Sequence, residues 1–140
     1  GVYPSHRDWI GRNEDFGVLG DSRLQEPYIC TGETENNWEN NNHGTFIASI
    51  VAGQTMGPAR SSNIHSIQIL DGNGEGSITS LLCAIEKLIQ DGIEYNSANS
   101  PKKIRAVVNL SLGVDGRSDV LDEAVGVLAD IGYVVVIAAG

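Results

Sequence analysis

Basic residues are scarce in this chain of 140 residues: nine Lys and Arg stand against 18 Asp and Glu, and the formal net charge is -9. Nucleic acids and anionic membrane surfaces bind proteins through clustered basic side chains, and the only adjacent pair here is Lys102 and Lys103. No apolar run approaches the length that spans a bilayer, and no basic segment followed by an apolar one opens the chain. We therefore expect neither nucleic acid nor a membrane as a partner.

Cysteine is also rare. Cys30 and Cys83 are the only two, and the sequence leaves open one disulfide or two free thiols. Hydrophobic residues make up 41% of the chain, which is enough for a core, and the length suits one domain or part of one. Because the chain opens at Gly1 and its last apolar run stops at Gly140, we expect a piece of a longer protein.

Apolar residues recur with regular periods from His43 onward. Helical spacing predicts helices over 44–52, 77–92 and 118–132, the second with Gly92 at its end and the third with Ser118 as its N-cap. The β-branched runs 64–70, 104–112 and 133–138 are typical of strands. Strands that alternate with helices predict parallel pairing through βαβ crossovers. Residues before 43 are predicted to be mostly loop, with a short strand near Tyr28 and Ile29.

A histidine stands at the predicted start of the first helix. His43 belongs to Asn42-His43-Gly44-Thr45, directly before the apolar run 46–52, which we expect to be a buried helix. The N–H groups and positive dipole end of a helix N-terminus disfavour an extra proton, so the imidazole is suited to act as a base. The alternative is a histidine that serves as a helix cap, and this motif alone does not decide between the two.

Three glycine-rich segments follow predicted strands, namely 70–76, 109–113 and 138–140. Ligands of parallel α/β sheets bind beyond the carboxyl ends of the strands, where open backbone groups can pair with an extended peptide. Ordinary turns explain each segment taken alone, but together with His43 the segments favour a binding site more strongly, because all of them follow strands of one predicted sheet. Phosphate is disfavoured because 71–76 is acidic and no GxGxxG turn leads from a strand into a helix.

The same segments resemble the subtilisin family (the subtilases), nearest to the proteinase K branch, in that family's order and spacing. The segments are 42–45, 69–76, 109–113 and 136–140, and residues 4–9 resemble the stretch after the family's catalytic aspartate. The resemblance implies an incomplete α/β fold with a three-layer, doubly wound, mainly parallel sheet and helices on both faces. It also implies a secreted, monomeric serine endopeptidase acting on a peptide or protein substrate. Calcium is possible in the full-length protein, but no cofactor is assignable here.

The resemblance further implies roles for individual residues. His43 is similar to the general base that takes the serine proton and returns it to the leaving amine. Leu70 with 74–76 would form one edge that pairs with the substrate backbone, and 111–113 would form the other. Residues 138–140 would form a wall of the pocket for the residue before the scissile bond, and Ile78 and Leu112 would help to line the pocket further from the cut. The predicted substrate-binding residues are Leu70, Gly74, Glu75, Gly76, Ile78, Ser111, Leu112, Gly113, Ala138, Ala139 and Gly140.

By the same resemblance, residues 1–140 are a partial catalytic domain. The catalytic aspartate would stand two residues before Gly1, the oxyanion asparagine would follow Gly140, and the nucleophilic serine would come much later. We expect this stretch alone to be inactive, because loss of even one oxyanion donor costs about 10²–10³ in rate. Asp8, Asp15 and Asp21 are predicted to be surface residues.

Two other functions stay open. A non-catalytic relative would bind peptide in the groove without cutting it, and the absence of the downstream serine would favour that function. An unrelated α/β small-molecule-binding module would hold a ligand at the glycine loops and give His43 no role. Glu75 is either a solvated loop charge or selects basic substrate side chains. In the first case, a Glu75→Gln change leaves the cleavage preference of the full enzyme unaltered.

Overall fold

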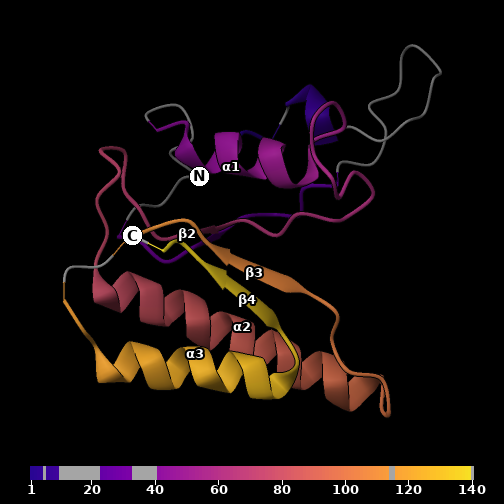
Figure 1. The fold of residues 1–140 in the computed structure, drawn as a ribbon, viewed down its shortest axis with the longest axis vertical. Coiled ribbons are helices and arrows are strands. Elements are labelled where there is room, and N and C mark those ends of the chain that lie inside the picture. The colour runs from indigo at the N-terminus through magenta and orange to yellow at the C-terminus, as the bar shows by residue number, and fades with distance from the viewer. Residues whose placement is uncertain (5, 10–22, 33–40, 114–115, 140) are drawn as a thin grey trace. The chain divides into compact units, whose positions relative to one another are not determined.

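The computed structural model describes residues 1–4, 6–9, 23–32, 41–113 and 116–139 (Figure 1). Asp15, Asp21 and Gly140, for which the sequence makes predictions, lie outside these ranges. The chain divides into two compact units, Gly1–Ser77 and Ile78–Gly140, and each unit is described by itself.

The first unit contains a 3₁₀ helix, an α-helix and a two-stranded parallel sheet. In chain order the elements are η1 (Arg7–Trp9), β1 (Tyr28–Ile29), α1 (His43–Ala52) and β2 (Ile67–Gln68). Tyr28 pairs with Ile67 and Ile29 with Gln68. The predicted short strand near Tyr28 is confirmed, whereas its parallel pairing with β2 is one that the sequence analysis did not predict. β2 is shorter than the predicted strand 64–70, of which the ends form only isolated bridges.

Trp9 is at the centre of this unit's core. Its side chain is fully buried together with Val2 and Leu24, and Ala48 of α1 packs against them. The indole Nε1 of Trp9 donates a hydrogen bond of 2.9 Å to the carbonyl oxygen of Tyr3, which gives the one polar group of the ring a partner. The core therefore joins α1 to the first residues of the chain.

Helix α1 is not buried as the sequence predicts. Phe46 is 62% and Ile50 is 50% exposed, whereas Ala52 is buried. Residues four apart share a face of a helix, so Phe46 and Ile50 lie on one face and Ala48 and Ala52 on another. The core of the unit meets the alanine face, and the prediction of a buried apolar stripe is wrong for that reason.

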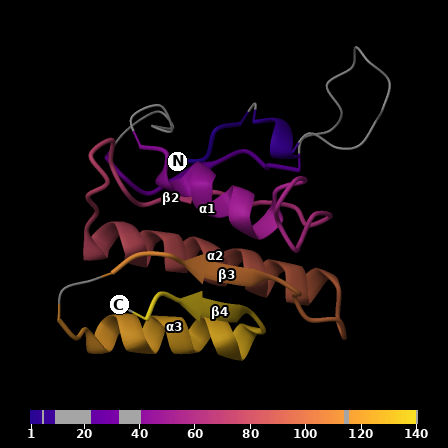
Figure 2. The ribbon, with the colours of Figure 1, turned by 45° about the horizontal axis from the view of Figure 1, so that its top comes forward.

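The second unit is a βαβ arrangement preceded by a long helix. Its elements are α2 (Ile78–Ala98), β3 (Val107–Leu110), α3 (Asp119–Ile131) and β4 (Val134–Ile137). β3 and β4 pair in parallel, from Val107 with Val134 to Leu110 with Ile137. α2 and α3 lie side by side, and α3 also packs against β4 (Figures 1 and 2). The buried apolar residues of this unit are Leu81, Ala84, Ile85, Val108, Leu121, Leu128 and Tyr133.

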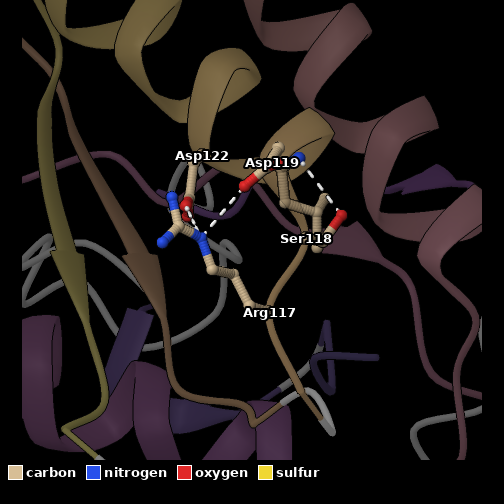
Figure 3. Close-up of polar contacts among 5 residues, drawn as sticks. Arg117, Ser118, Asp119 and Asp122 are labelled. Carbon is tan, nitrogen blue, oxygen red and sulfur yellow. Dashed lines mark hydrogen bonds and ion pairs between the residues drawn. The ribbon is translucent and has the colours of Figure 1, made fainter.

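The start of α3 is fixed by its cap. Ser118 has an extended backbone, and its Oγ accepts a hydrogen bond of 3.4 Å from the backbone N of Leu121 (Figure 3), as predicted for an N-cap. Nε of Arg117 lies 2.9 Å from Oδ1 of Asp119 and 3.7 Å from Oδ2 of Asp122. These ion pairs are exposed, so their contribution to stability is small. The cap, together with acidic residues in the first turn, decides where the helix begins.

Helix α2 continues past Gly92 to Ala98, so the prediction that Gly92 ends it is wrong. Gly92 is buried, and a Cβ atom added there would lie 2.6 Å from Cγ2 of Ile131 and 2.9 Å from Cε2 of Tyr133. Glycine at this position lets α2 approach the end of α3 closely. Its role is therefore packing within the helix and not termination.

Of the two states that the sequence leaves open for the cysteines, one disulfide or two free thiols, the structure excludes the free thiols. Neither is a free thiol: Cys30 and Cys83 are both disulfide-bonded. Disulfides persist in oxidising compartments and are rare where thiols are kept reduced. Disulfide-bonded cysteines are therefore typical of a protein in an oxidising compartment.

Candidate functional site

His43 is the first residue of α1, and its side chain is exposed. The backbone N of His43 donates a hydrogen bond of 2.9 Å to Oδ1 of Asn41, while the N-cap residue Asn42 makes no side-chain cap bond. The amide of Asn41 thus satisfies one of the N–H groups that a helix start leaves unpaired.

The glycine-rich turn after β2 is held by its own carboxylate. Leu70 and Gly76 form an antiparallel bridge, and Oδ1 of Asp71 accepts hydrogen bonds of 2.9 Å from the backbone N of both Asn73 and Glu75. The backbone N of Asp71 donates to the carbonyl oxygen of Glu75 at 2.8 Å. These bonds order the backbone of the turn and leave the Glu75 side chain exposed.

Asn41 connects this turn to the start of α1. Gly74 has a φ of +83°, a conformation that favours glycine, and a Cβ atom added there would lie 2.6 Å from Nδ2 of Asn41. Oδ1 of the same side chain accepts the hydrogen bond from His43. One amide therefore contacts both the turn and the histidine residue, and places them next to each other within the first unit.

In the second unit, the segments that follow β3 and β4 leave the sheet at the same end, because the two strands are parallel. The backbone N of Ala138 donates to the carbonyl oxygen of Leu110 at 3.1 Å, so the parallel pairing continues past both strands. Nδ2 of Asn109 donates to Oγ of Ser111 at 2.8 Å. The adjoining candidates at this end of the sheet are half-buried Leu112 and exposed Gly113, Ala138 and Ala139. Ile78, at the start of α2, is 46% exposed.

Comparison with known proteins identifies the family. Residues 18–140 match the family model described as the subtilase family. This chain belongs to the subtilase family. Over its whole length it is 29% identical to proteinase T of Parengyodontium album and 36% identical to an extracellular serine proteinase of Thermus sp. (strain Rt41A). It spans 42% of the first relative and 29% of the second, which is less than half the length of either.

A solved structure supports the same fold. The subtilase chain aligns along 100% of its length with the crystal structure of a cold adapted subtilisin-like serine proteinase, with a TM-score of 0.74 and 24% identity. It covers 43% of that chain. The predicted fold class, an incomplete α/β fold of the subtilisin type with parallel strands, is confirmed.

Sequence reasoning misses two contacts of this subtilase chain that bear on His43. One is the amide of Asn41 described above. The other is Thr45, whose Oγ1 accepts a hydrogen bond of 2.8 Å from the backbone N of Tyr3. Thr45 belongs to the motif that pointed to His43, but nothing in the local pattern indicates a partner 42 residues away.

Asp8, which the sequence analysis places at the surface, is partly exposed, and Oγ1 of Thr55 donates a hydrogen bond of 2.9 Å to its Oδ1. Its carbonyl oxygen accepts hydrogen bonds from the backbone N of Gln54 and from Nη2 of Arg23. Asp8 therefore ties η1 to the residues that follow α1, and its carboxylate is occupied there.

Within the described ranges, no three His, Cys, Asp or Glu side chains gather as the ligands of a metal ion would. In the same part of the subtilase chain, no helix is long and apolar enough to cross a membrane. The candidate residues that the structure does place are an exposed imidazole at a helix start and the backbone of glycine-rich segments. Such groups suit proton transfer and the binding of an extended peptide.

Proposed function

We propose that the full-length protein is a serine endopeptidase that hydrolyses peptide bonds by a Ser-His-Asp triad with His43 as general base. Membership of the subtilase family supports this, and the two relatives named above are proteinases. The observation that carries the proposal is the position of His43, which opens α1 beside turn 70–76, with Asn41 contacting both. An imidazole next to a backbone edge is the arrangement that a base acting on a bound peptide requires.

In this mechanism His43 removes the proton from the serine hydroxyl as the oxygen attacks the scissile carbonyl, and then gives it to the leaving amine. In this proposal the edges 74–76 and 111–113 each pair with the substrate backbone as an added strand does, and 138–140 form a wall of the pocket for the residue before the cut. Leu70 belongs to the first of these edges, and Ile78 and Leu112 help to line the pocket further from the cut. The aspartate, the serine and the oxyanion asparagine belong to other parts of the full-length protein, so residues 1–140 alone are expected to be inactive.

The same proposal places a monomeric enzyme outside the cell, acting on a peptide or protein substrate. The Thermus relative is an extracellular proteinase, and the disulfide-bonded state of Cys30 and Cys83 suits an oxidising compartment. Detection of the mature protein in the culture medium of its source would support this placement, and strict retention in the cytosol would contradict it.

The test is hydrolysis of a chromogenic peptide by the full-length protein. We expect His43→Ala to lower kcat by about 10⁶-fold, the order that loss of a triad histidine costs. His65→Ala is the matched control, because His65 is exposed and lies outside the proposed site; its activity should equal that of the parent. Undiminished hydrolysis by His43→Ala would refute the proposal. Peptide binding without cleavage by the unaltered protein would instead support a non-catalytic relative.

A further inference from the structure

We propose that Asp71 is a positioning residue for the substrate. Its carboxylate holds the edge 74–76 in the shape that pairs with an extended peptide, before any peptide binds. The inference deepens the proposed function and rests on it, because it takes this edge as a substrate-binding edge of an endopeptidase. All contacts that support it join residues that the structure describes.

The first support is the set of hydrogen bonds that Asp71 makes across the turn. Its Oδ1 accepts hydrogen bonds of 2.9 Å from the backbone N of Asn73 and from that of Glu75. Its own backbone N donates to the carbonyl oxygen of Glu75 at 2.8 Å, and its carbonyl oxygen accepts from the backbone N of Gly74 at 3.1 Å. One residue therefore holds each of the three residues 73–75.

The second support is the open backbone of Gly76, the last residue of the edge. Gly76 is exposed and pairs with Leu70 in an antiparallel bridge, next to the hydrogen bond between Asp71 and Glu75. Among the residues that the structure describes, none makes a hydrogen bond to the N–H or the C=O of Gly76. Residues of antiparallel strands can exchange both of these bonds, so Gly76 offers a substrate residue one donor and one acceptor.

The third support is close packing at both ends of the edge. A Cβ atom added at Gly76 would lie 2.6 Å from the carbonyl oxygen of Ile69, and one added at Gly74 would lie 2.6 Å from Nδ2 of Asn41. Oδ1 of Asn41 accepts a hydrogen bond from the backbone N of His43. The edge is thus fixed beside the start of the helix that carries the proposed general base.

A pre-formed edge acts on substrate binding and not on the chemical step. A peptide that pairs with a fixed edge does not have to order it, whereas the ordering of a loose loop lowers affinity. The loss of an interaction that is equally strong in the ground state and the transition state raises KM and leaves kcat unchanged. Only a substrate long enough to pair as a strand can contact the edge in this way.

The experiment compares variants of the full-length protein on two substrates, a chromogenic peptide of several residues and a chromogenic ester of one acylated amino acid. Asp71→Ala removes the acceptor. We expect it to raise KM for the peptide about 10-fold, the effect of about one lost hydrogen bond, with kcat changed less than about twofold. Hydrolysis of the ester should not change. Asp71→Asn keeps an amide oxygen as the acceptor and should restore the parent KM for the peptide.

Glu26→Ala is the control for charge, because Glu26 is an exposed carboxylate of the same unit outside the turn. It should behave as the parent on both substrates. A parent-like peptide KM in Asp71→Ala would overturn the inference. Equal losses on peptide and ester would also overturn it, since they would leave Asp71 only a structural role. An Asp71→Asn protein as weak as Asp71→Ala would do the same, because the charge and not the acceptor would then matter.

Hydrogen exchange covers the case in which Asp71→Ala does not fold. The unaltered full-length protein is inhibited by a reagent that carries no peptide, and the backbone N–H groups of Asn73 and Glu75 should then exchange more slowly than in a short peptide of the same sequence. Exchange at the rate of the short peptide would overturn the inference. If His43→Ala stays active, the proposed function is what fails. If His43→Ala is inactive on both substrates while Asp71→Ala behaves as the parent, only the positioning role fails.

Discussion

The guanidinium of Arg23 donates a hydrogen bond of 2.9 Å from Nη2 to the carbonyl oxygen of Ala52, the last residue of α1. The same nitrogen donates to the carbonyl oxygen of Asp8 at 2.6 Å, and Nη1 donates to that of Ser62 at 2.8 Å. A helix ends with unpaired carbonyl groups and a partial negative charge. Arg23 donates a hydrogen bond to one of these carbonyl groups and brings a positive charge close to the helix end. The helix that begins with His43 is therefore held at its other end by one cation that contacts three carbonyl groups.

We predict that Arg23→Lys lowers the free energy of unfolding by about 1–3 kcal/mol, because an ammonium cannot contact the three carbonyls in one planar fork. Nε of Arg23 is buried without a hydrogen-bond partner in the described part of the chain, and its removal offsets part of the loss. The measurement is chemical denaturation of the full-length protein with its protease activity inhibited.

Arg117→Lys is the control for this prediction. Its ion pairs with Asp119 and Asp122 are exposed, so we expect a change within about 0.5 kcal/mol. Equal losses in the two variants would contradict the role given to Arg23.

A second prediction concerns the close approach at Gly92. Alanine in place of an interior helix glycine usually stabilises by about 0.5–1 kcal/mol. At Gly92 the added Cβ would lie 2.6 Å from Ile131 and 2.9 Å from Tyr133, and overpacking typically costs about 1–3 kcal/mol. We expect a net loss of stability for Gly92→Ala in thermal or urea unfolding of the full-length protein.

Gly126→Ala supplies the comparison, because a Cβ atom there meets nothing within 4 Å. It should raise stability by up to about 1 kcal/mol. A stabilising Gly92→Ala, with a gain like that of Gly126→Ala, would show that α2 and the end of α3 are not tightly packed at this point.

Sequence patterns predicted the helix ends and the turn that depend on interactions between residues close in the chain. Ser118 as a cap and Gly132 as the end of α3 follow from the needs of helix termini, and the structure has a capping hydrogen bond at the first and a φ of +123° at the second. His43 at a helix start follows from the period of the apolar residues after it. The turn 70–76 follows from its glycines, of which Gly74 has a positive φ.

Contacts between distant parts of the chain could not be predicted in this way. Gly92 has the signature of a helix end, yet tertiary packing against Ile131 and Tyr133 keeps it inside α2. The hydrogen bond between Thr45 and Tyr3 joins residues 42 positions apart, and the periodicity of apolar residues cannot predict a contact between such distant residues. The hydrogen bond between Asp8 and Thr55 is a third example, because a single sequence does not reveal which carboxylates find partners.

Tyr133 offers a test of the second unit through pH. The side chain is 5% exposed, and its hydroxyl donates a hydrogen bond of 2.8 Å to the carbonyl oxygen of Leu88. Burial, and next the nearby carboxylate of Asp91, raise the pKa of the Tyr133 phenol above its ordinary value of 10.0. Both causes act against the phenolate, which would lose water and meet a like charge.

The folded protein therefore holds the Tyr133 proton more tightly than the unfolded chain does. Its contribution to stability is complete below pH 10 and is lost as the pH rises through the pKa of the folded state. We predict that Tyr133→Phe makes the free energy of unfolding fall less steeply above about pH 10, as measured by urea denaturation of the full-length protein over a pH series. Tyr95→Phe, which alters an exposed phenol of α2, should leave the slope of the parent unchanged. Titrating lysines contribute equally to all three proteins, so a parent-like alkaline slope in Tyr133→Phe would show that this phenol does not couple folding to pH.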